Sequence, residues 1–242
     1  MHDARQSALV RNTLLHMLCP PGEKVPYVLS LLTYHFTGME EGLALLREAG
    51  KSKIRLEVFT EKILFRHFTK EHLAGESNHD AWYLSSSLTE DKLRMADCIL
   101  IPVLSFSLAG DLLRFNDQRD FVRIILQALL SGKKVAALPY GNDPFHEVFR
   151  SKELDRGSEY LKTELHKTLF QLKKLGVTLL RDGEGLAPWL NDSSQKQSVI
   201  SEADILSAAK AQKKLLIAEE HAIITPLARD AAKQYGIKIS RQ

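Results

Sequence analysis

The sequence predicts an α/β protein with a doubly wound parallel sheet. Short apolar runs rich in β-branched residues alternate with longer amphipathic segments from about residue 25 to residue 182. One run, residues 98–104, has the apolar content of a strand buried on both faces, as in a parallel sheet. Because crossovers between parallel strands are right-handed, we expect helices on both faces of this sheet.

The bulk composition is that of an ordinary globular protein. With 242 residues, of which 44% are hydrophobic and 26% charged, the chain can bury a substantial core. The net charge is +3 and the basic residues are dispersed among acidic ones, which argues against nucleic acid as a partner. The two cysteines, Cys19 and Cys98, lie far apart and indicate neither a disulfide framework nor a Cys-rich metal site. We find no membrane-spanning run and no cleavable signal, so we expect a cytoplasmic protein without a membrane partner.

The order of elements supports this fold class. Residues 25–32 predict a strand, residues 39–49 an amphipathic helix closed by Gly50, and residues 54–59 a second strand, which together form a parallel βαβ unit. A polar loop rich in His and Gly is expected before residue 81, and a loop carrying Ser105 and Ser107 after residue 104. The other expected elements are strands at 81–84, 98–104, 134–138 and 177–180, and helices at 90–95, 121–130 and 160–175.

Four parts are expected along the chain. They are an N-terminal helical arm at residues 1–24, the main domain at 25–182, a linker at 183–200 and a C-terminal helix-strand tail at 201–242. The linker is predicted because residues 182–197 are rich in Gly, Asp, Asn, Ser and Gln. In the tail, Ser201 suits a helix N-cap and Pro226 suits the first turn of a second helix. No internal repeat is evident in the sequence.

Hydroxyl side chains gather where the predicted strands end. Ser105 and Ser107 follow the strand at 98–104, and ligands of open α/β sheets lie at the carboxyl ends of the strands. The first loop places Thr33 and Thr37 before a helix N-terminus, where free N–H groups suit a phosphate monoester. The same threonines would also serve as turn and cap residues, so both interpretations stay open.

Several common sites are not found in the sequence. There is no Gly-x-Gly-x-x-Gly after the first strand, no P-loop and no Gly-x-Ser-x-Gly elbow. The histidines lack the spacing of a preformed metal site; His67 and His72, for example, are five positions apart and do not share a helix face. We therefore expect no metal.

The stretch ADCILIPVLSFSLAGDLLRFND, residues 96–117, resembles the FMN-binding, homo-oligomeric cysteine decarboxylases and their relatives. That family has Ala-Asp, an apolar strand, Pro, a small-residue loop ending in Asn-Thr, and a helix that begins Leu-Ala. The matching positions are Ala96, Asp97, Pro102, Ser107, Leu108, Ala109 and Asp117. The segment PYGNDPF, residues 139–145, is similar to the family's Pro-x-Met-Asn turn, with Asn142 as the counterpart of its Asn.

The resemblance implies a flavodoxin-like (Rossmann-like) fold, FMN as the cofactor, and a homo-oligomer of three or more subunits. Thr60 falls where family members place a Ser or Thr for the FMN phosphate, and we expect Thr33 and Thr37 near that phosphate as well. Ser105, Phe106 and Ser107 are expected beside the isoalloxazine ring. The expected cofactor residues are thus Thr33, Thr37, Thr60, Ser105, Phe106, Ser107 and Asn142.

Departures from the family pattern bear on the chemistry. Phe106 stands where decarboxylating members carry Asn, and Leu88 stands where the catalytic His is expected. Because Phe and Leu can neither transfer a proton nor hold a substrate carboxylate, we expect an FMN-binding redox or electron-transfer component of a bacterial metabolic pathway. Two alternatives stay open: a lyase or transferase in which His35 of the first loop donates the proton, and a non-catalytic interaction protein.

The tail segment AIITPLARDAAKQYGIKI, residues 222–239, resembles one that recurs in proteins encoded with bacterial microcompartments, including ethanolamine-utilisation proteins. The resemblance implies a location inside such a compartment. Because helices this short need a surface to pack on, we expect the tail to dock on the protein's own sheet or on a neighbouring subunit, with a compartment enzyme or shell protein as the alternative. In each case the tail is expected to lie apart from the flavin site.

Overall fold

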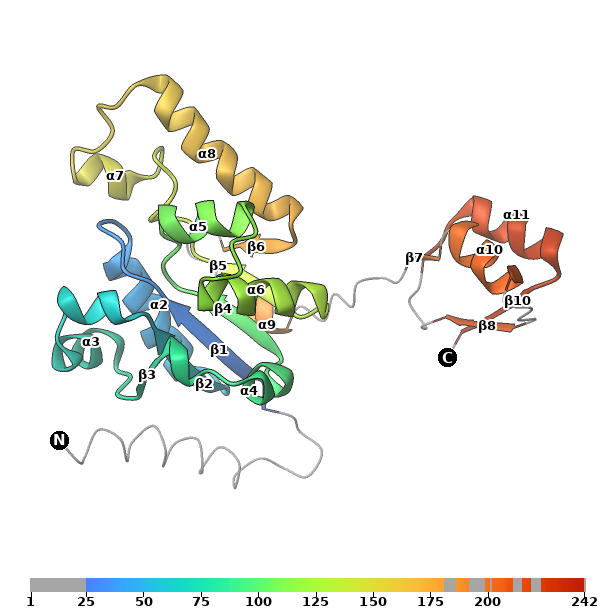
Figure 1. Cartoon of the computed structure of the whole chain (residues 1–242), viewed down its shortest axis with the longest axis horizontal. Helices are drawn as coiled ribbons and strands as arrows, with labels where there is room; N and C mark the ends of the chain where they lie inside the picture. Colours follow the sequence, from blue (N-terminus) through green and yellow to red (C-terminus); the bar gives the residue numbers. More distant parts are fainter. Residues whose placement is uncertain are drawn as a thin grey trace. The chain divides into compact units, whose positions relative to one another are not determined.

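A computed structural model describes residues 25–180, 186–191, 199–200, 202–210, 215–218 and 223–241 (Figure 1). The arm expected at residues 1–24 lies outside the described residues, as does most of the expected linker. The chain divides into two compact units, Met1–Pro188 and Trp189–Gln242. Separate clusters of buried apolar residues form the core of each unit.

The first unit is built on a six-stranded parallel sheet with the order β3-β2-β1-β4-β5-β6. Its strands are β1 (Tyr27–Leu32), β2 (Arg55–Thr60), β3 (Trp82–Leu84), β4 (Cys98–Ile101), β5 (Lys134–Ala137) and β6 (Val177–Leu179). This is a doubly wound order, and without the edge strand β3 the remaining five strands have the order of flavodoxin-like sheets. The predicted fold class is therefore confirmed.

Helices cover both faces of the sheet. They are α2 (Met39–Lys51), α3 (Lys70–Ser77), α4 (Glu90–Met95), α5 (Phe106–Leu113), α6 (Asp120–Leu130), α7 (Glu147–Ser151) and α8 (Glu159–Lys174), with short 3₁₀ helices η1 (Lys62–Arg66) and η2 (Ser85–Ser87). In Figure 1, α6 lies in front of the sheet and α2 behind it. The strands between them are buried on both sides, which explains why β4 is an unbroken apolar run and why β1 is apolar except for the buried Ser30.

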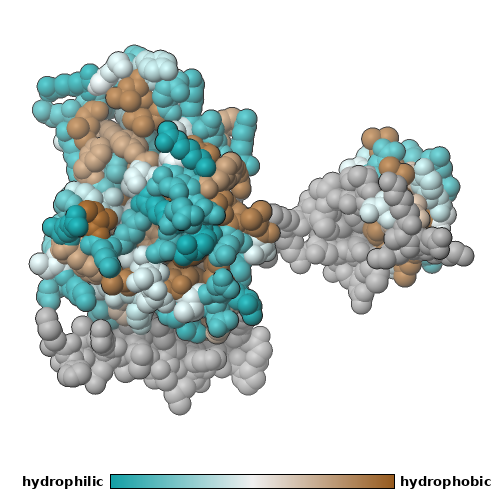
Figure 2. Space-filling model, in the orientation of Figure 1, coloured by the Kyte–Doolittle hydropathy of each residue, from teal (hydrophilic) through white to brown (hydrophobic). Residues whose placement is uncertain are grey.

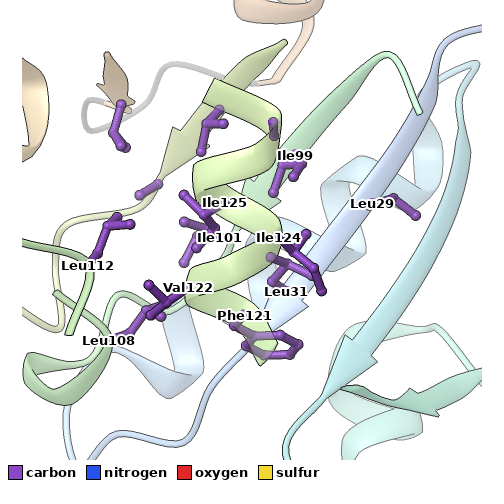
Figure 3. Packing of buried hydrophobic residues seen from close by; sticks show 14 of the residues in the cluster. Leu29, Leu31, Ile99, Ile101, Leu108, Leu112, Phe121, Val122, Ile124 and Ile125 are labelled. Carbon is purple, nitrogen blue, oxygen red and sulfur yellow. The ribbon is translucent and has the colours of Figure 1, made fainter. Parts of the chain in front are cut away.

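The core of the first unit forms between α6 and the sheet. Figure 3 shows Phe121, Val122 and Ile125 of α6 packed over Ile99 and Ile101 of β4. Each of these side chains is fully buried, and burying one such side chain contributes about 1.5–3 kcal/mol to the free energy of unfolding.

Cys98, in the same sheet, also behaves as an apolar core residue. Burial raises the pKa of its thiol to about 12, so the thiol stays protonated and unreactive.

Two helices occupy segments that the sequence predicted as loops. Helix α3 begins after Thr69, whose side chain accepts a hydrogen bond from the His72 N–H, and Leu73 is its fully buried apolar anchor. A single buried leucine in a two-turn helix leaves little periodic signal, which is why this helix was not predicted. Helix α5 begins after Ser105, whose hydroxyl accepts from the Leu108 N–H at 3.1 Å. Ser105 therefore serves as a helix cap, and the residues after it form a first turn rather than a loop.

The predicted linker also contains regular structure. Residues 186–191 form helix α9 (Leu186–Asn191), and both Leu186 and Trp189 are buried. Their spacing of three places them on one helix face, and Pro188 falls in the first turn, where its missing N–H costs nothing. The polar composition of the surrounding segment hid this helix.

The second unit is a small α/β fold of its own. It comprises β7 (Val199–Ile200), α10 (Glu202–Lys210), β8 (Leu215–Ala218), β9 (Ile223–Ile224), α11 (Pro226–Tyr235) and β10 (Lys238–Arg241). Strand β7 pairs in parallel with β9, and β8 with β10, so the unit consists of two similar strand-helix-strand halves. The sequence alone did not show this repeat. Ile205, Ala228 and Ile237 belong to a shared core, so the two short helices dock on each other.

Among the helices in the described ranges, none is long and apolar enough to cross a membrane.

Candidate functional site

The candidate site lies where the chain changes winding direction, at the carboxyl ends of β1 and β4. The connections from these neighbouring strands lead to opposite sides of the sheet, which opens a crevice in folds of this type. Here the crevice is bridged by side chains. The Thr33 hydroxyl donates to Val103 O at 2.9 Å, and the Thr37 hydroxyl donates to Gly141 O at 3.0 Å. The loops after β1, β4 and β5 are thus tied together.

Glycines allow this close approach of the loops. Gly38 has a φ of +75°, and a Cβ placed there would lie 2.8 Å from Gly141 N. Gly42 of α2 faces the loop after β4, where a Cβ would lie 2.8 Å from Pro102 O. Both distances are shorter than any van der Waals contact, so these positions require glycine.

The predicted phosphate residues differ in what they can offer. Thr33 and Thr37 are fully buried, and their hydroxyl protons are engaged by backbone carbonyls. Thr60 is also fully buried, but its hydroxyl makes a longer hydrogen bond, 3.3 Å to Glu61 O, and is therefore the weakest held of the three. The first turn of α2 carries Glu40 and Glu41, which already stabilise the positive end of the helix dipole and oppose a second anion there.

Positive charge is available beside β2. Lys62, Arg66 and Lys70 are exposed in η1 and at the start of α3. The ring of Tyr34, in the loop after β1, stacks on His67 with centroids 3.6 Å apart and planes 2° apart. This stack joins the first loop to the basic segment that carries Lys62, Arg66 and Lys70. A phosphate near Thr60 would therefore lie close to these cations.

His35 is buried at the centre of the site. It is 5% exposed, and its Nδ1 lies 2.8 Å from the Thr37 hydroxyl oxygen. The Thr37 hydroxyl, which donates its own proton to Gly141 O, can accept from an Nδ1–H, whereas the Thr37 backbone N–H lies 3.3 Å from Nδ1 and donates to it in the other tautomer, so the contacts of Nδ1 are compatible with both neutral tautomers. His35 Nε2 is buried and has no hydrogen-bond partner. Burial lowers the pKa of His35, and the nearby Lys152 ammonium lowers it further.

This arrangement predicts a pH-dependent stability. A histidine whose pKa is lower in the folded than in the unfolded state binds fewer protons when folded, so acid favours unfolding. The contribution is complete above the ordinary value of 6.5 and is lost progressively as the pH falls below it. Replacing His35 with Asn, which cannot be protonated in this range, should reduce the drop in urea midpoint between pH 7 and pH 5. Equal drops in both proteins would contradict this, since the two proteins differ only at position 35.

Asn142 is the second buried polar group at this edge, and it is fully buried. One end of its amide lies 3.1 Å from the Thr168 hydroxyl of α8, while the other end has no hydrogen-bond partner. The turn that carries Asn142 touches His35, because a Cβ at Gly141 would lie 3.5 Å from His35 Nδ1. A buried polar atom without a partner costs about 1–3 kcal/mol, so both residues are suited to a ligand.

Aromatic rings surround His35. The Phe106 ring stands edge-on to the imidazole at 4.7 Å between centroids, and Phe36 lies 4.2 Å from it. Phe36 is 51% exposed, so the site presents a flat apolar surface to solvent. Of the predicted ring-side residues, Phe106 therefore lies next to His35, and Ser105 caps the helix on which Phe106 lies.

Ser107 instead belongs to an ion-pair network. The Arg119 guanidinium donates to both carboxylate oxygens of Glu61, at 2.7 and 2.8 Å, and to Asp111 at 3.0 Å. It also donates to the Ser107 hydroxyl. This network fixes the start of α5 and α6 against the end of β2. Sequence reasoning did not find Arg119, because its partners lie 8, 12 and 58 positions away.

Leu88, which stands where the sequence resemblance implies a catalytic His, has apolar surroundings. It packs against the apolar core of the first unit. Sequence reasoning did not single out Phe36 or Thr168, which the fold brings to this edge. No group of three or more potential metal ligands converges among the described residues.

The parts of FMN can be compared with these residues. A flat heteroaromatic ring suits the exposed Phe36 and the unpartnered His35 Nε2 and Asn142 amide. A phosphate suits the Thr60 side of the site, next to the basic segment, better than the Thr33 and Thr37 hydroxyls. The residues present thus fit FMN, but fewer of them can contact its phosphate than the sequence predicted.

Comparisons with known proteins concern the fold. No protein-family model matches the chain, and no curated protein matches its sequence. Among solved structures, AnUbiX (PadA1) in complex with FMN and dimethylallyl pyrophosphate has a TM-score of 0.45 at 9% identity, covering 78% of this chain and 90% of that chain. A PPC decarboxylase variant has 0.42 at 16% identity, covering 66% and 88%. A dodecameric FMN-dependent Ubix-like decarboxylase from Escherichia coli has 0.41 at 14%, covering 63% and 77%. Likenesses this distant say nothing of the ligand of this chain.

Proposed function

We propose that the chain binds FMN at the carboxyl edge of the sheet and acts as a redox or electron-transfer component. The observation that carries the proposal is the pair of buried polar groups without partners, His35 Nε2 and one end of the Asn142 amide, beside the exposed ring of Phe36. An isoalloxazine has a polar edge that can pair with such groups and an aromatic face that can pack on a phenyl ring.

Each residue then has a defined task. Phe36 and Phe106 hold the ring plane, Asn142 and His35 Nε2 pair with its polar edge, and Thr60 faces the phosphate. Bound FMN would supply one-electron and two-electron transfer. The three tied loops keep these groups in fixed positions, since the hydrogen bonds of Thr33 and Thr37 hold the loops together.

Decarboxylation by the family's route is disfavoured by the side chains at its key positions. Phe106 has no polar atom to hold a carboxylate, and Leu88 is packed on the core and carries no titratable group. One observation favours a lyase or transferase as the second candidate. The buried Nε2 of His35 has no protein partner, and in the neutral tautomer that carries its proton on Nδ1 this nitrogen could take a proton from a substrate.

The test is to load the full chain with FMN and follow the flavin absorbance. We expect saturable binding below about 10 µM, since FMN sites with several hydrogen bonds and a stacked ring reach micromolar affinity or better. NADH, NADPH or dithionite should then bleach the bound flavin, and a peptide ending in cysteine should release no CO₂. Release of CO₂ without flavin reduction by either nicotinamide would establish the lyase instead. If the chain does not bind FMN at tens of micromolar, the remaining alternative is a non-catalytic interaction protein.

The assembly of the chain is part of this proposal. Figure 2 shows apolar surface around α7 and the start of α8, where Phe145, Leu154 and Leu161 are 43–53% exposed. A homo-oligomer of three or more subunits would cover such a surface. The second unit, which has its own core, would serve as the attachment element for a compartment enzyme or shell protein. The support for a microcompartment is the likeness of residues 222–239 to segments of such proteins.

A further inference from the structure

Four rings lie in a row where η1 and the start of α3 meet the loop after β1. The Tyr34 ring stacks on the His67 ring, and its centroid lies 6.2 Å from that of Phe68. The Phe68 ring in turn stacks on the His72 ring, with centroids 5.4 Å apart and planes 6° apart. Tyr34 and Phe68 are half-buried, whereas both imidazoles are exposed.

The two imidazoles at the outside of this row are accessible to a ligand. Within residues 25–180, no hydrogen bond or ion pair reaches the ring nitrogens of His67 or His72. Tyr34 covers one face of the His67 ring, and His67 is still exposed. A flat aromatic ligand can therefore extend the Tyr34–His67 stack on its outer side, since histidine is among the side chains on which nucleobases stack.

Positive charge gathers on the same segment. Residues three apart in a 3₁₀ helix lie on one face, so Lys62 and Phe65 share a face of η1. The Lys70 ammonium lies 5.4 Å from the centroid of the Phe65 ring, which brings both lysines to this ring. Among the ion pairs of the described residues, none involves Lys62, Arg66 or Lys70. Three exposed cations are thus open to an anion.

The acids of this segment do not cancel these cations. The carboxylate of Glu61 accepts from the Arg119 guanidinium with both oxygens, at 2.7 and 2.8 Å. Glu71 is exposed in the first turn of α3, where it faces the positive end of the helix dipole. Residues 62–72 therefore keep an excess of positive charge beside the row of rings.

We propose that this surface binds a purine nucleotide that carries two phosphate groups. The base extends the Tyr34–His67 stack, and the phosphates lie among the three cations, whose charge matches the about three negative charges of a diphosphate at neutral pH. The second phosphate could belong to a nucleoside 5′-diphosphate or to the 2′,5′-bisphosphate end of a dinucleotide. A single nucleotide fits better than a polymer, because the cations occupy one short segment and the basic residues elsewhere are dispersed.

The surface is distinct from the proposed flavin contacts. None of the seven residues expected to contact FMN belongs to the row of rings or to the three cations. The flavin phosphate proposed near Thr60 would lie beside this surface, so the two ligands would be neighbours. The proposal does not rest on the proposed function.

The experiment is a saturation-transfer NMR titration of the full chain with ADP and with adenosine 2′,5′-bisphosphate, at an ionic strength of about 50 mM where screening is weak. We expect saturable transfer to the adenine protons, with a Kd of about 0.1–1 mM. Adenosine, the uncharged analogue, should bind at least fivefold more weakly. The nucleotide that binds more tightly identifies the position of the second phosphate.

Variants separate the rings from the charges. His67→Ala should weaken ADP binding about fivefold, because it removes the stacking partner of the base, whereas His67→Phe keeps a ring on Tyr34 and should stay within about twofold. Lys70→Ala should weaken binding about threefold. Lys174→Ala is the matched control, since the ammonium of this exposed lysine also lies over a phenylalanine ring, 4.6 Å from Phe170, but on α8.

Five results would overturn the proposal. They are absence of saturable binding of both nucleotides, equal affinity for adenosine and ADP, and equal effects of Lys70→Ala and Lys174→Ala. The fourth is loss of ADP binding when the chain is saturated with FMN, which would make the surface a part of the flavin site. The fifth is binding of a ten-nucleotide oligoadenylate about a hundredfold tighter than ADP, which would indicate nucleic acid. A chain that does not bind FMN at all leaves the ADP titration unchanged, so the two proposals fail separately.

Discussion

Replacing Gly42 with Ala will lower the free energy of unfolding by about 2–3 kcal/mol, a typical cost of forcing an extra methyl group into a packed interface. The new Cβ would overlap the Val103 side chain and lie 2.8 Å from Pro102 O, so α2 would have to move away from the loop after β4. The measurement is urea unfolding followed by far-ultraviolet circular dichroism. Because α2 and that loop border the candidate site, FMN affinity should fall in the same variant.

Gly110→Ala is the control for this prediction. Gly110 is also helical, but a Cβ there meets nothing within 4 Å. Alanine has a higher helix propensity than glycine by up to about 1 kcal/mol, so this variant should be slightly more stable than the parent chain. If both substitutions change the free energy of unfolding by the same amount and sign, the close packing of α2 on the loop after β4 is not the reason that position 42 requires glycine.

Replacing Asn142 with Ala will weaken FMN binding about tenfold or more. The variant removes the amide end that has no protein partner and that we assign to the flavin, and one lost hydrogen bond in a buried site is equivalent to about 1–2 kcal/mol. The measurement is the Kd for FMN from flavin fluorescence. The free energy of unfolding without FMN should change little, because Asn142→Ala removes a buried amide whose hydrogen bonds are incomplete.

Thr168→Val is the matched control for Asn142. It removes the hydrogen bond between Thr168 and Asn142 but keeps the unpartnered end of the amide. FMN affinity should then stay within about threefold of the parent value. If Thr168→Val weakens binding as much as Asn142→Ala, Asn142 acts only by holding the turn against α8.

The regular elements with strong periodicity could be predicted from the sequence. Helix α6 buries Phe121, Ile124 and Ile125 at helical spacing, and the buried strands β1 and β4 are short runs of mainly apolar residues. Helices α3 and α9 were not predicted, because each is short and anchored by one or two buried residues in a polar segment. Local pattern is a weak signal where tertiary contacts supply most of the stability.

The sequence predicted which residues lie at this edge of the sheet, but it did not predict their contacts. The sequence located the edge where Thr33, Thr37 and Phe106 lie, since strand ends in an alternating α/β pattern mark the ligand edge. It did not show that the two threonine hydroxyls are used to tie neighbouring loops, because their acceptors are backbone carbonyls 70 and 104 positions away. For the same reason it did not show that His35 and Asn142 are left with unpartnered atoms.

The sequence by itself determined the fold class, the winding of the sheet and the sheet edge at which the candidate site lies, because the period of apolar residues and the position of strand ends are local properties. Only the tertiary structure decided which polar groups remain available at that edge and which rings and cations share the surface after β2. Availability depends on which distant backbone and side-chain atoms meet each group, as Thr168 meets Asn142 and Arg119 meets Glu61. Such pairings arise from the packing of whole elements, which no short segment specifies.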